Sequence, residues 1–439
     1  MPEKRNVSRM TRPASKASDL SSQQESPVLS QRAPPSAVKA LSSKQRPKLQ
    51  RGERVKTMKY SFEVRSLLGS GGFGDVYKVL RTNGGTRAHF AMKTEGMGLR
   101  PEQERLKLEA RILREMSSIK KPEDKKHFVE YIDKGRTQTY KFLVMTLVGD
   151  SLHSLRKDRY NNHLEASSVI RIALQTLDSI RDLHAIGFIH RDIKPHNFAI
   201  GRTTKNSTIF MLDFGIVHKF IDRDGKLKPP RQKTRFIGTV RYAPRSCHQQ
   251  REQSRADDIE SWLFMIYEFF DNDNLAWRRV TDRENVVQLK QMFMENNPVV
   301  LAKEVAPSDL RRIVRYVDNL TYEQEPDYPH IRQIVLDAAK KNKLRTDTPF
   351  EWEQEESQLC ETVSTGTNEG VQKESLIARP VLCLLHNVSK CSFCRVKKVR
   401  QKKKNSKGSK GSQGSEEDEN RKESVVRKVT SQKKKKSSS

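Results

Sequence analysis

The stretch from residue 190 to residue 215 constrains this chain more than any other, because it places two carboxylates, a lysine and a carboxamide at fixed spacing. It opens with the run His190-Arg191-Asp192-Ile193-Lys194-Pro195-His196-Asn197 and closes with Asp213-Phe214-Gly215. These residue types in this order suit the alignment of a hydroxyl group with the terminal phosphate of a nucleotide, while a magnesium ion absorbs charge. The stretch therefore predicts phosphoryl transfer.

Each polar residue of this stretch has a side chain that matches one part of that chemistry. Asp192 is the candidate base, and Lys194 would neutralise charge on the transferred phosphoryl group. Asn197 and Asp213 are the candidate magnesium ligands, because a hard cation prefers oxygen ligands. A lone Asp-Phe-Gly would be weak evidence, but together with His-Arg-Asp and the asparagine that follows it becomes specific.

A glycine-rich turn between two predicted strands lies upstream of this stretch. The strand at 60–64 leads into the spacing Gly69-x-Gly71-x-x-Gly74, with Val76 beyond it. Such a turn lets backbone amides approach a polyphosphate, although the same glycine spacing alone would also fit a dinucleotide-binding fold. Val76 and the strand that continues from it, in place of a helix, favour a kinase-type nucleotide loop.

A lysine and a glutamate are predicted to form an ion pair beside this loop. Lys93 ends an otherwise apolar strand at 89–93, which would bring its ammonium to the phosphates. Glu109 lies on a helix that starts near Pro101 and is placed to hold Lys93 there. An ordinary exposed glutamate on a charged helix is the alternative interpretation of Glu109.

A hinge between two lobes is predicted at 146–150, after the strand at 140–145. Backbone groups of Thr146 and Val148 would meet the adenine edge, and Met145 would lie behind the ring, which is also compatible with an ordinary core methionine. The predicted nucleotide contacts are Gly69, Gly71, Gly72, Gly74, Val76, Ala91, Lys93, Glu109, Met145, Thr146 and Val148.

Composition divides the chain into three parts. A formal charge of +30, with 31% charged and 34% hydrophobic residues, indicates that part of the chain is too polar to pack. We predict a disordered basic arm at 1–56, a folded domain at 57–353 and a largely disordered, lysine-rich tail at 354–439. Hydrophobic periodicity predicts helices in the folded domain at 167–184, 257–270, 284–295 and 307–320.

The sequence shows no export or membrane signal. The start of the chain lacks the apolar core of a secretory signal, and no apolar run approaches the roughly 20 residues that span a bilayer. Five cysteines at uneven spacing suit a reducing compartment. We therefore expect an intracellular protein with no membrane contact, in the cytoplasm and, because basic tails permit import, also in the nucleus.

From Gly69 to about Trp352 the chain resembles the casein kinase 1 superfamily of serine/threonine protein kinases, and most of all its tau-tubulin kinase branch with the nematode relatives. This resemblance covers about two-thirds of the chain. The residues that carry it are Asn197-Phe198-Ala199-Ile200-Gly201, Lys228-Pro229-Pro230-Arg231, Gly238-Thr239-Val240-Arg241-Tyr242-Ala243 and Ser254-Arg255-Ala256-Asp257-Asp258-Ile259-Glu260-Ser261.

The resemblance implies an α+β, bilobal protein kinase fold, with a β-rich N-lobe, a helical C-lobe, and ATP and Mg²⁺ between them in a monomer. Thr239 would bridge Asp192 and Lys194, and Asp258 would anchor the catalytic loop. An anion pocket for the substrate would consist of Arg241, Arg235 and Arg283. The implied substrates are serine or threonine residues near acidic or already phosphorylated residues.

Two departures from the family pattern affect what the resemblance implies. Pro244-Arg245-Ser246 stands where relatives carry Ser-Ile-Asn, so the substrate-side loop and the specificity stay open. Thr146 stands where classical members have an acidic hinge residue, which affects inhibitors more than chemistry.

Three alternatives accompany the kinase interpretation. In the first alternative, the chain is a catalytically weak pseudokinase that binds acidic partners, although the chain retains Lys93, Asp192 and Asp213. In the second alternative, the lysine runs of the tail, such as 433–436, bind acidic polymers with strong salt dependence. These runs also fit a solvated tail or an import signal.

The third alternative concerns a metal site in the tail. Four residues of the tail have spacings that suit zinc, although free thiols are the simpler interpretation. They are Cys383, His386, Cys391 and Cys394.

Overall fold

The computed structural model describes residues 48–72, 74–98, 104–296 and 306–355. All of them lie in one of the two units into which the chain divides, Met1–Glu356. Most of the predicted arm and tail lies outside the described residues, as do the four candidate zinc ligands at 383–394. Within the described part of the chain, no helix combines the length and the apolar composition needed to cross a membrane.

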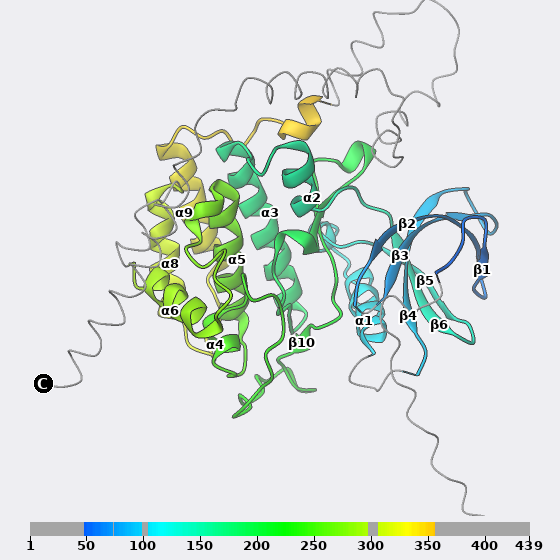
Figure 1. Ribbon diagram of the computed structural model, residues 1–439, viewed down its shortest axis with the longest axis horizontal. Coiled ribbons are helices and arrows are strands. Elements are labelled where there is room, and N and C mark those ends of the chain that lie inside the picture. Colours follow the sequence, from blue (N-terminus) through cyan, green and yellow to red (C-terminus); the bar gives the residue numbers. More distant parts are fainter. Residues whose placement is uncertain (1–47, 73, 99–103, 297–305, 356–439) are drawn as a thin grey trace, which may run out of the picture. The chain divides into compact units, whose positions relative to one another are not determined.

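The smaller lobe is built on one antiparallel sheet of six strands in the order β1-β2-β3-β4-β6-β5 (Figure 1). Alternation of apolar and polar residues favours these strands, because successive side chains point to opposite faces. In β2, for example, Phe62 and Val64 are buried while their neighbours are partly exposed. The strands are β1 (Arg54–Lys56), β2 (Ser61–Ser70), β3 (Asp75–Arg81), β4 (His89–Gly96), β5 (Tyr131–Arg136) and β6 (Tyr140–Thr146).

The two faces of this sheet carry different side chains. One face packs into a small apolar cluster that includes Phe62, Tyr77 and Met92. The opposite face presents the predicted nucleotide contacts, because Ala91 and Lys93 are two residues apart in β4, and Lys93 pairs with Val76 of β3. The strand pattern therefore places three predicted nucleotide contacts on one surface.

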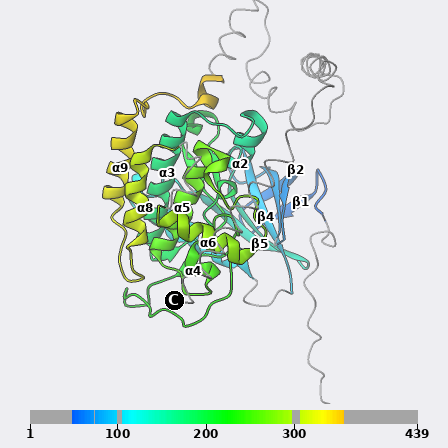
Figure 2. The same cartoon turned by 60° about the vertical axis from the view of Figure 1, so that its left-hand side comes forward.

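The larger lobe is helical, with α3 (Ala166–Ala185) and α5 (Arg255–Phe270) at its centre (Figures 1 and 2). Both helices are buried on most sides, so their apolar residues are not confined to one stripe. A capping box between Ser254 and Asp257 starts α5. The other helices are α1 (Arg105–Ser117), which packs on the sheet, α2 (Leu152–Ser154), α4 (Arg245–His248), α6 (Arg283–Met294), α8 (Arg311–Asp318) and α9 (Tyr328–Lys341).

Two short antiparallel strand pairs hold the predicted catalytic stretch. β7 pairs with β10, and β8 pairs with β9. Because β7 ends just before His190 and β9 ends just before the Asp213 turn, these strand pairs fix both ends of the stretch. Their bounds are β7 (Phe188–Ile189), β8 (Phe198–Ile200), β9 (Ile209–Met211) and β10 (His218–Lys219). The predicted bilobal α+β architecture is confirmed.

Some element boundaries differ from the prediction. β1 lies within the segment assigned to the disordered arm, and its Val55 is only 3% exposed. The helix predicted at 307–320 is a 3₁₀ turn at Ser308–Leu310 followed by the shorter α8. Helix α9 was not predicted. A three-residue strand such as β1 is stabilised by its pairing with β2 (Arg54–Lys56 against Ser61–Glu63), a tertiary contact that local composition does not reveal.

Candidate active site

Lys93 lies between two carboxylates from different elements. Its Nζ donates to Glu109 Oε2 at 2.6 Å and to Asp213 Oδ1 at 2.9 Å. Helix α1 supplies Glu109, which is 2% exposed. Burial works to lower the pKa of Lys93, but the two carboxylates outweigh it and raise that pKa. The ion pair predicted between Lys93 and Glu109 is therefore present, and the lysine stays cationic.

Asp213 is held with its carboxylate turned to this lysine. Its backbone φ of +63° lies in the left-handed region, which a non-glycine residue adopts only where the surroundings enforce it. Burial works to raise the pKa of Asp213, but the Lys93 ammonium outweighs it and lowers the pKa to about 2. The side chain is half exposed and ionised, so its oxygens are accessible to a cation.

The side chains of Asp192, Lys194 and Thr239 form a triangle of hydrogen bonds. Lys194 Nζ donates to Asp192 Oδ2 at 2.6 Å and to Thr239 Oγ1 at 2.9 Å, and Thr239 Oγ1 donates to Asp192 Oδ1 at 2.8 Å. Asn197 is 5% exposed, and its Nδ2 donates to the backbone oxygen of Asp192 at 2.8 Å. Since the amide nitrogen of Asn197 is used in this way, its Oδ1 is the atom that can face a cation.

A buried carboxylate from α5 anchors the catalytic loop. Asp258 is 1% exposed and accepts from the backbone amides of His190 at 2.6 Å and Arg191 at 2.9 Å, and from His184 Nε2 at 2.8 Å. Burial works to raise the pKa of Asp258, but these donors lower it. Arg191 has a φ of +67°, a strained conformation that the bond to Asp258 helps to hold.

The glycine-rich turn requires glycine most clearly at Gly74. A Cβ added there would lie 1.9 Å from the backbone oxygen of Thr94 on β4, so only glycine allows the two strands to approach. The Gly71 amide donates to the Gly74 backbone oxygen at 2.9 Å, which closes the turn. At Gly69 and Gly72 a Cβ would meet no atom within 4 Å. Packing against β4 thus explains why residue 74 is glycine. The absence of side chains at Gly69 and Gly72 leaves the turn open to an approaching ligand.

The hinge follows β6 and is tied to the start of β5. Met145 is 7% exposed and pairs with Ala91, which puts both on the nucleotide face of the sheet. The Thr146 amide donates to the Glu130 backbone oxygen at 3.1 Å, and Thr146 Oγ1 accepts from the Glu130 amide at 3.1 Å. The amide of Thr146 is therefore occupied, and its carbonyl is the group that can meet an adenine.

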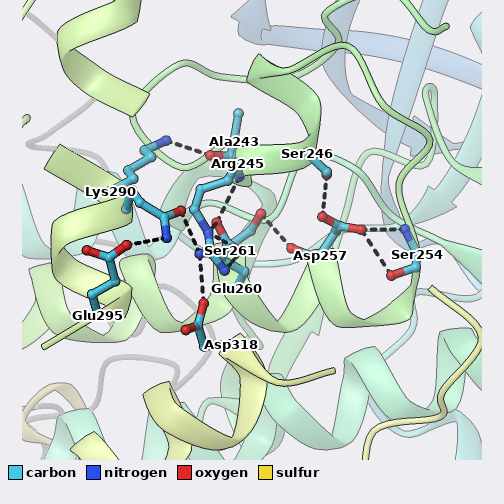
Figure 3. A network of polar contacts seen from close by, with 11 residues as sticks. Ala243, Arg245, Ser246, Ser254, Asp257, Glu260, Ser261, Lys290, Glu295 and Asp318 are labelled. Carbon is cyan, nitrogen blue, oxygen red and sulfur yellow. Dashed lines mark hydrogen bonds and ion pairs between the residues drawn. The ribbon is translucent and has the colours of Figure 1, made fainter. Parts of the chain in front are cut away.

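Residues 238–244, here called the substrate loop, are anchored by Arg245, the first residue of α4 (Figure 3). Its side chain is 14% exposed and reaches Glu260 Oε2 on α5 at 3.1 Å and Asp318 Oδ1 on α8 at 2.7 Å. Ser246 Oγ bonds Asp257 of the same helix α5. Arg245 thus points into the helical lobe, where it holds the loop in place.

Lys290 and Trp277 bind the backbone of the substrate loop from below. Lys290 is 0% exposed, and its Nζ donates to the carbonyl oxygen of Val240 at 2.8 Å and to that of Ala243 at 2.5 Å; Figure 3 shows the bond to Ala243. Trp277 Nε1 donates to the Arg241 carbonyl oxygen at 2.8 Å. Burial lowers the pKa of Lys290 to about 7. Three carbonyls of the loop are therefore fixed by side chains that the sequence did not single out.

Arg241 is turned toward a buried carboxylate. Its Nη1 donates to Glu268 Oε1 at 3.0 Å, and Glu268, which is 0% exposed, also contacts Arg278 at 3.3 Å and Arg156 at 3.7 Å. The Tyr242 hydroxyl donates to the same carboxylate. Three guanidinium groups therefore surround one carboxylate, and the side chain of Arg241 is still 34% exposed.

The other two arginines of the predicted anion pocket lie near Phe236. The guanidinium of Arg283 lies 4.6 Å from the centre of the Phe236 ring, and Arg235 is the residue before Phe236. Arg241 instead meets Glu268 of α5. The three predicted arginines therefore form two groups, with Arg241 at Glu268 and with Arg235 and Arg283 near Phe236.

The donor set fits the predicted nucleotide and cation. Mg²⁺ is commonly held by one or two protein oxygen ligands together with phosphate oxygens and water. Asp213 and Asn197 offer side-chain oxygens of this kind, and Lys93 offers a fixed positive charge that suits phosphates. The described residues contain no group of three or more His, Cys, Asp or Glu residues placed to hold a metal ion.

One contact to the glycine-rich turn comes from the segment assigned to the arm. Lys48 Nζ donates to Asp75 Oδ1 at 2.5 Å and to Ser70 Oγ at 2.8 Å, and Ser70 Oγ donates to Asp75 Oδ1 at 2.6 Å. Both partners lie at the strand ends that flank the turn. Sequence reasoning missed this contact, because a single lysine in a basic segment carries no positional signal.

Comparison with known proteins agrees with this geometry. Residues 62–293 match the model of the protein kinase domain. The Caenorhabditis elegans serine/threonine-protein kinase spe-6 is 30% identical over 312 residues, which is 70% of this chain and 79% of that protein. A second C. elegans protein, named as a serine/threonine-protein kinase, is 34% identical over 65% of this chain and 83% of its own length. A Dictyostelium discoideum protein with a similar name is 29% identical over 67% of this chain and 57% of its own length.

Proposed function

The chain belongs to the protein kinase family and is a serine/threonine protein kinase, and from this premise we propose that it phosphorylates serine or threonine residues that lie near acidic or phosphorylated residues. We further propose that it belongs to the casein kinase 1 superfamily, in the tau-tubulin kinase-like branch. The hydrogen-bonded triangle of Asp192, Lys194 and Thr239 is the observation that carries the transfer chemistry.

ATP supplies the phosphoryl group, and Mg²⁺ neutralises part of its charge. The protein's own residues position the reactants. Lys93, held by Glu109, would contact the phosphates, and Asn197 and Asp213 would hold the cation. Asp192 would accept the proton of the substrate hydroxyl, while Lys194 would neutralise charge on the group in transfer. Asp258 keeps the backbone before Asp192 in place through two amide bonds.

The proposed preference for negatively charged substrates is supported by the charge around Glu268. Arg156, Arg241 and Arg278 share this single carboxylate. Two positive charges are left uncompensated within that group, and Arg241 and Arg278 keep 34% and 25% of their side chains exposed. A guanidinium can bind a carboxylate or phosphate through two parallel hydrogen bonds. An acidic side chain on the substrate would therefore be attracted beside the substrate loop.

Placement in the casein kinase 1 superfamily is supported by the substrate loop. The family motif residue Thr239 contacts Asp192 and Lys194, and Asp258 binds the catalytic loop, which is the arrangement that the resemblance implies. Arg245 departs from the pattern of these relatives. Its side chain lies in the helical lobe, so its expected effect falls on the stability of the loop and not on substrate choice.

The test is phosphate transfer from labelled ATP to two serine peptides of equal length, one with acidic or phosphorylated neighbours and one with neutral neighbours. The expected result is faster transfer to the charged peptide and loss of both activities in Lys93→Met. Equal rates on the two peptides would contradict the substrate preference. No transfer to either peptide or to a general acidic protein would instead support the pseudokinase alternative.

A further inference from the structure

A cavity of about 320 Å³ lies at the hinge, apart from the candidate catalytic residues. Its lining includes none of Lys93, Asp192 and Asp213. Ligand pockets in proteins start at about 300 Å³, so this volume admits a small ligand or one side chain of a partner. The residues that line it are His89, Glu130, Thr146, Leu147, Val148, Gly201, Arg202, Thr203, Thr204, Lys205 and Phe210.

Both lobes contribute basic side chains to this cavity. His89 is the first residue of β4 in the smaller lobe, whereas Arg202 and Lys205 belong to the turn between β8 and β9 in the larger lobe. The hinge segment 146–148 forms the wall between them. A ligand in the cavity would therefore contact both lobes at the point where they are joined.

Further basic residues lie close to His89 on the sheet, outside the lining of the cavity. Lys78 of β3 pairs with Ala91, so Lys78 and His89 are diagonal neighbours on one face, about 7–8 Å apart at the backbone and within reach of a long side chain. Arg65 lies at a bulge of β2 next to Lys78. Burial lowers the pKa of Lys78, and the positive charges of Arg202 and Arg65 lower it further.

The same surroundings act on His89. Burial first, and then the positive charges of Lys78, Arg65, Arg202 and Arg87, lower its pKa. A lysine and three arginines thus act together on one imidazole. The basic side chains form one electrostatic group, although they come from four separate segments of the chain.

This group has few acidic partners. Within the described part of the chain, Arg65 forms an ion pair with Glu63 at 3.0 Å, whereas Lys78, Arg202 and Lys205 form none. Glu130 is the acidic residue of the lining. Like charges held close together destabilise a fold unless an anion compensates them. The cavity therefore combines adequate volume with an excess of positive charge.

We propose that the hinge cavity binds a phosphate group, held by Arg202 and Lys205 from the larger lobe and by His89 from the smaller lobe, with the positive charge of Lys78 next to His89 on the sheet. A guanidinium fork and ammonium groups suit phosphate oxygens, and the Thr204 hydroxyl adds a further donor. Two sources carry this chemistry, a free oligophosphate and a phosphorylated side chain of a protein. Thr146 and Val148 of its lining are also predicted adenine contacts, whereas Lys93, Asp192 and Asp213 lie outside it, so the proposal does not depend on phosphate transfer.

The test compares two double variants of the full chain that change the same amount of charge. Arg202→Glu with Lys205→Glu alters the cavity, and Lys134→Glu with Lys340→Glu alters two exposed lysines outside it. The nucleotide site is first filled with Mg²⁺ and a nonhydrolysable ATP analogue. Calorimetric titrations then use inorganic pyrophosphate, a phosphoserine peptide and its unphosphorylated counterpart. Thermal unfolding shows that both variants are folded.

The expected result is that the cavity variant loses one binding event, or binds it at least about tenfold more weakly than the control variant, as the loss of a charged hydrogen bond predicts. Loss with pyrophosphate alone assigns the site to free oligophosphates, and loss with the phosphopeptide alone assigns it to phosphorylated protein. Identical titrations of the two variants with both probes would overturn the proposal, since the binding would then belong to other basic surfaces.

Discussion

Thr239 Oγ1 donates a hydrogen bond to Asp192 Oδ1 at 2.8 Å and accepts one from Lys194 Nζ at 2.9 Å. One hydroxyl group thus joins the substrate loop to the candidate base and to the lysine beside it. The position of the loop and the orientation of Asp192 are therefore coupled. Contacts far from ATP that hold this loop should affect transfer through the same hydroxyl.

Replacement of Thr239 by alanine is expected to lower kcat by about 10- to 100-fold, because small errors in the position of reacting groups reduce rates by that much. The KM for ATP should stay the same, since Thr239 does not line the nucleotide face of the sheet. Thr239→Ser keeps the hydroxyl and should retain most of the activity. Steady-state kinetics measure kcat for both variants. Equal kcat values for Thr239→Ser and Thr239→Ala would refute the coupling between the substrate loop and Asp192.

Lys290→Met is expected to loosen the substrate loop. The variant loses the donor to the carbonyl oxygens of Val240 and Ala243, so KM for a protein substrate should rise about tenfold. KM for ATP should not change, because Lys290 lies below the loop and away from Lys93. A rise in KM for the protein substrate without a rise in KM for ATP distinguishes positioning of the loop from general destabilisation, provided that the variant unfolds cooperatively. Equal changes in both KM values would contradict a role of Lys290 in positioning the loop.

Arg245→Met is expected to destabilise the domain by about 3 kcal/mol, because it removes the guanidinium that pairs with the carboxylates of Glu260 and Asp318. The matched control is Lys341→Met, which removes a more exposed ion pair with Asp309 and should cost less than about 1 kcal/mol. Urea unfolding followed by fluorescence gives both values. Similar decreases of the unfolding free energy in the two variants would show that the ion pairs of Arg245 do not hold the substrate loop in place.

The catalytic residues were predictable because they are close in sequence and belong to motifs with fixed spacing. Asp192, Lys194 and Asn197 fall within six residues, and the pairing of Lys93 with Glu109 follows from a strand and a helix with clear patterns. The bilobal α+β fold was predictable through the family resemblance that the motifs carry.

Contacts between distant segments were not predictable. Lys290, Trp277 and Glu268 bind the substrate loop, but each stands in an ordinary helical or apolar context that indicates only burial. The strand β1 and the Lys48 contact also depend on a partner that comes later in the chain. The anchoring role of Arg245 was not predictable either, because its partner Asp318 is 73 residues away in sequence.

Acid is expected to destabilise the protein partly through His127. This histidine is 0% exposed, its Nδ1 donates to the Ile209 carbonyl oxygen at 2.8 Å, and its Nε2 has no partner among the described residues. Burial lowers its pKa to about 4, so the folded protein keeps it neutral while the unfolded chain binds a proton near pH 6.5.

The stability that His127 contributes is complete above pH 6.5 and is lost as the pH falls towards 4, by on the order of 3 kcal/mol. His127→Asn keeps a donor for Ile209 and removes the titration, so its unfolding free energy should depend less on pH in this interval. Parallel pH profiles for the wild type and the variant, measured by urea unfolding, would contradict this prediction.

The most direct test of the account is single-turnover phosphate transfer by Asp192→Asn. Asparagine preserves the size of the side chain but cannot accept the proton of the substrate hydroxyl. Transfer to a serine peptide is expected to fall by about 100-fold or more, while the affinity for Mg²⁺ and ATP is unchanged. Transfer at the wild-type rate in this variant would contradict it.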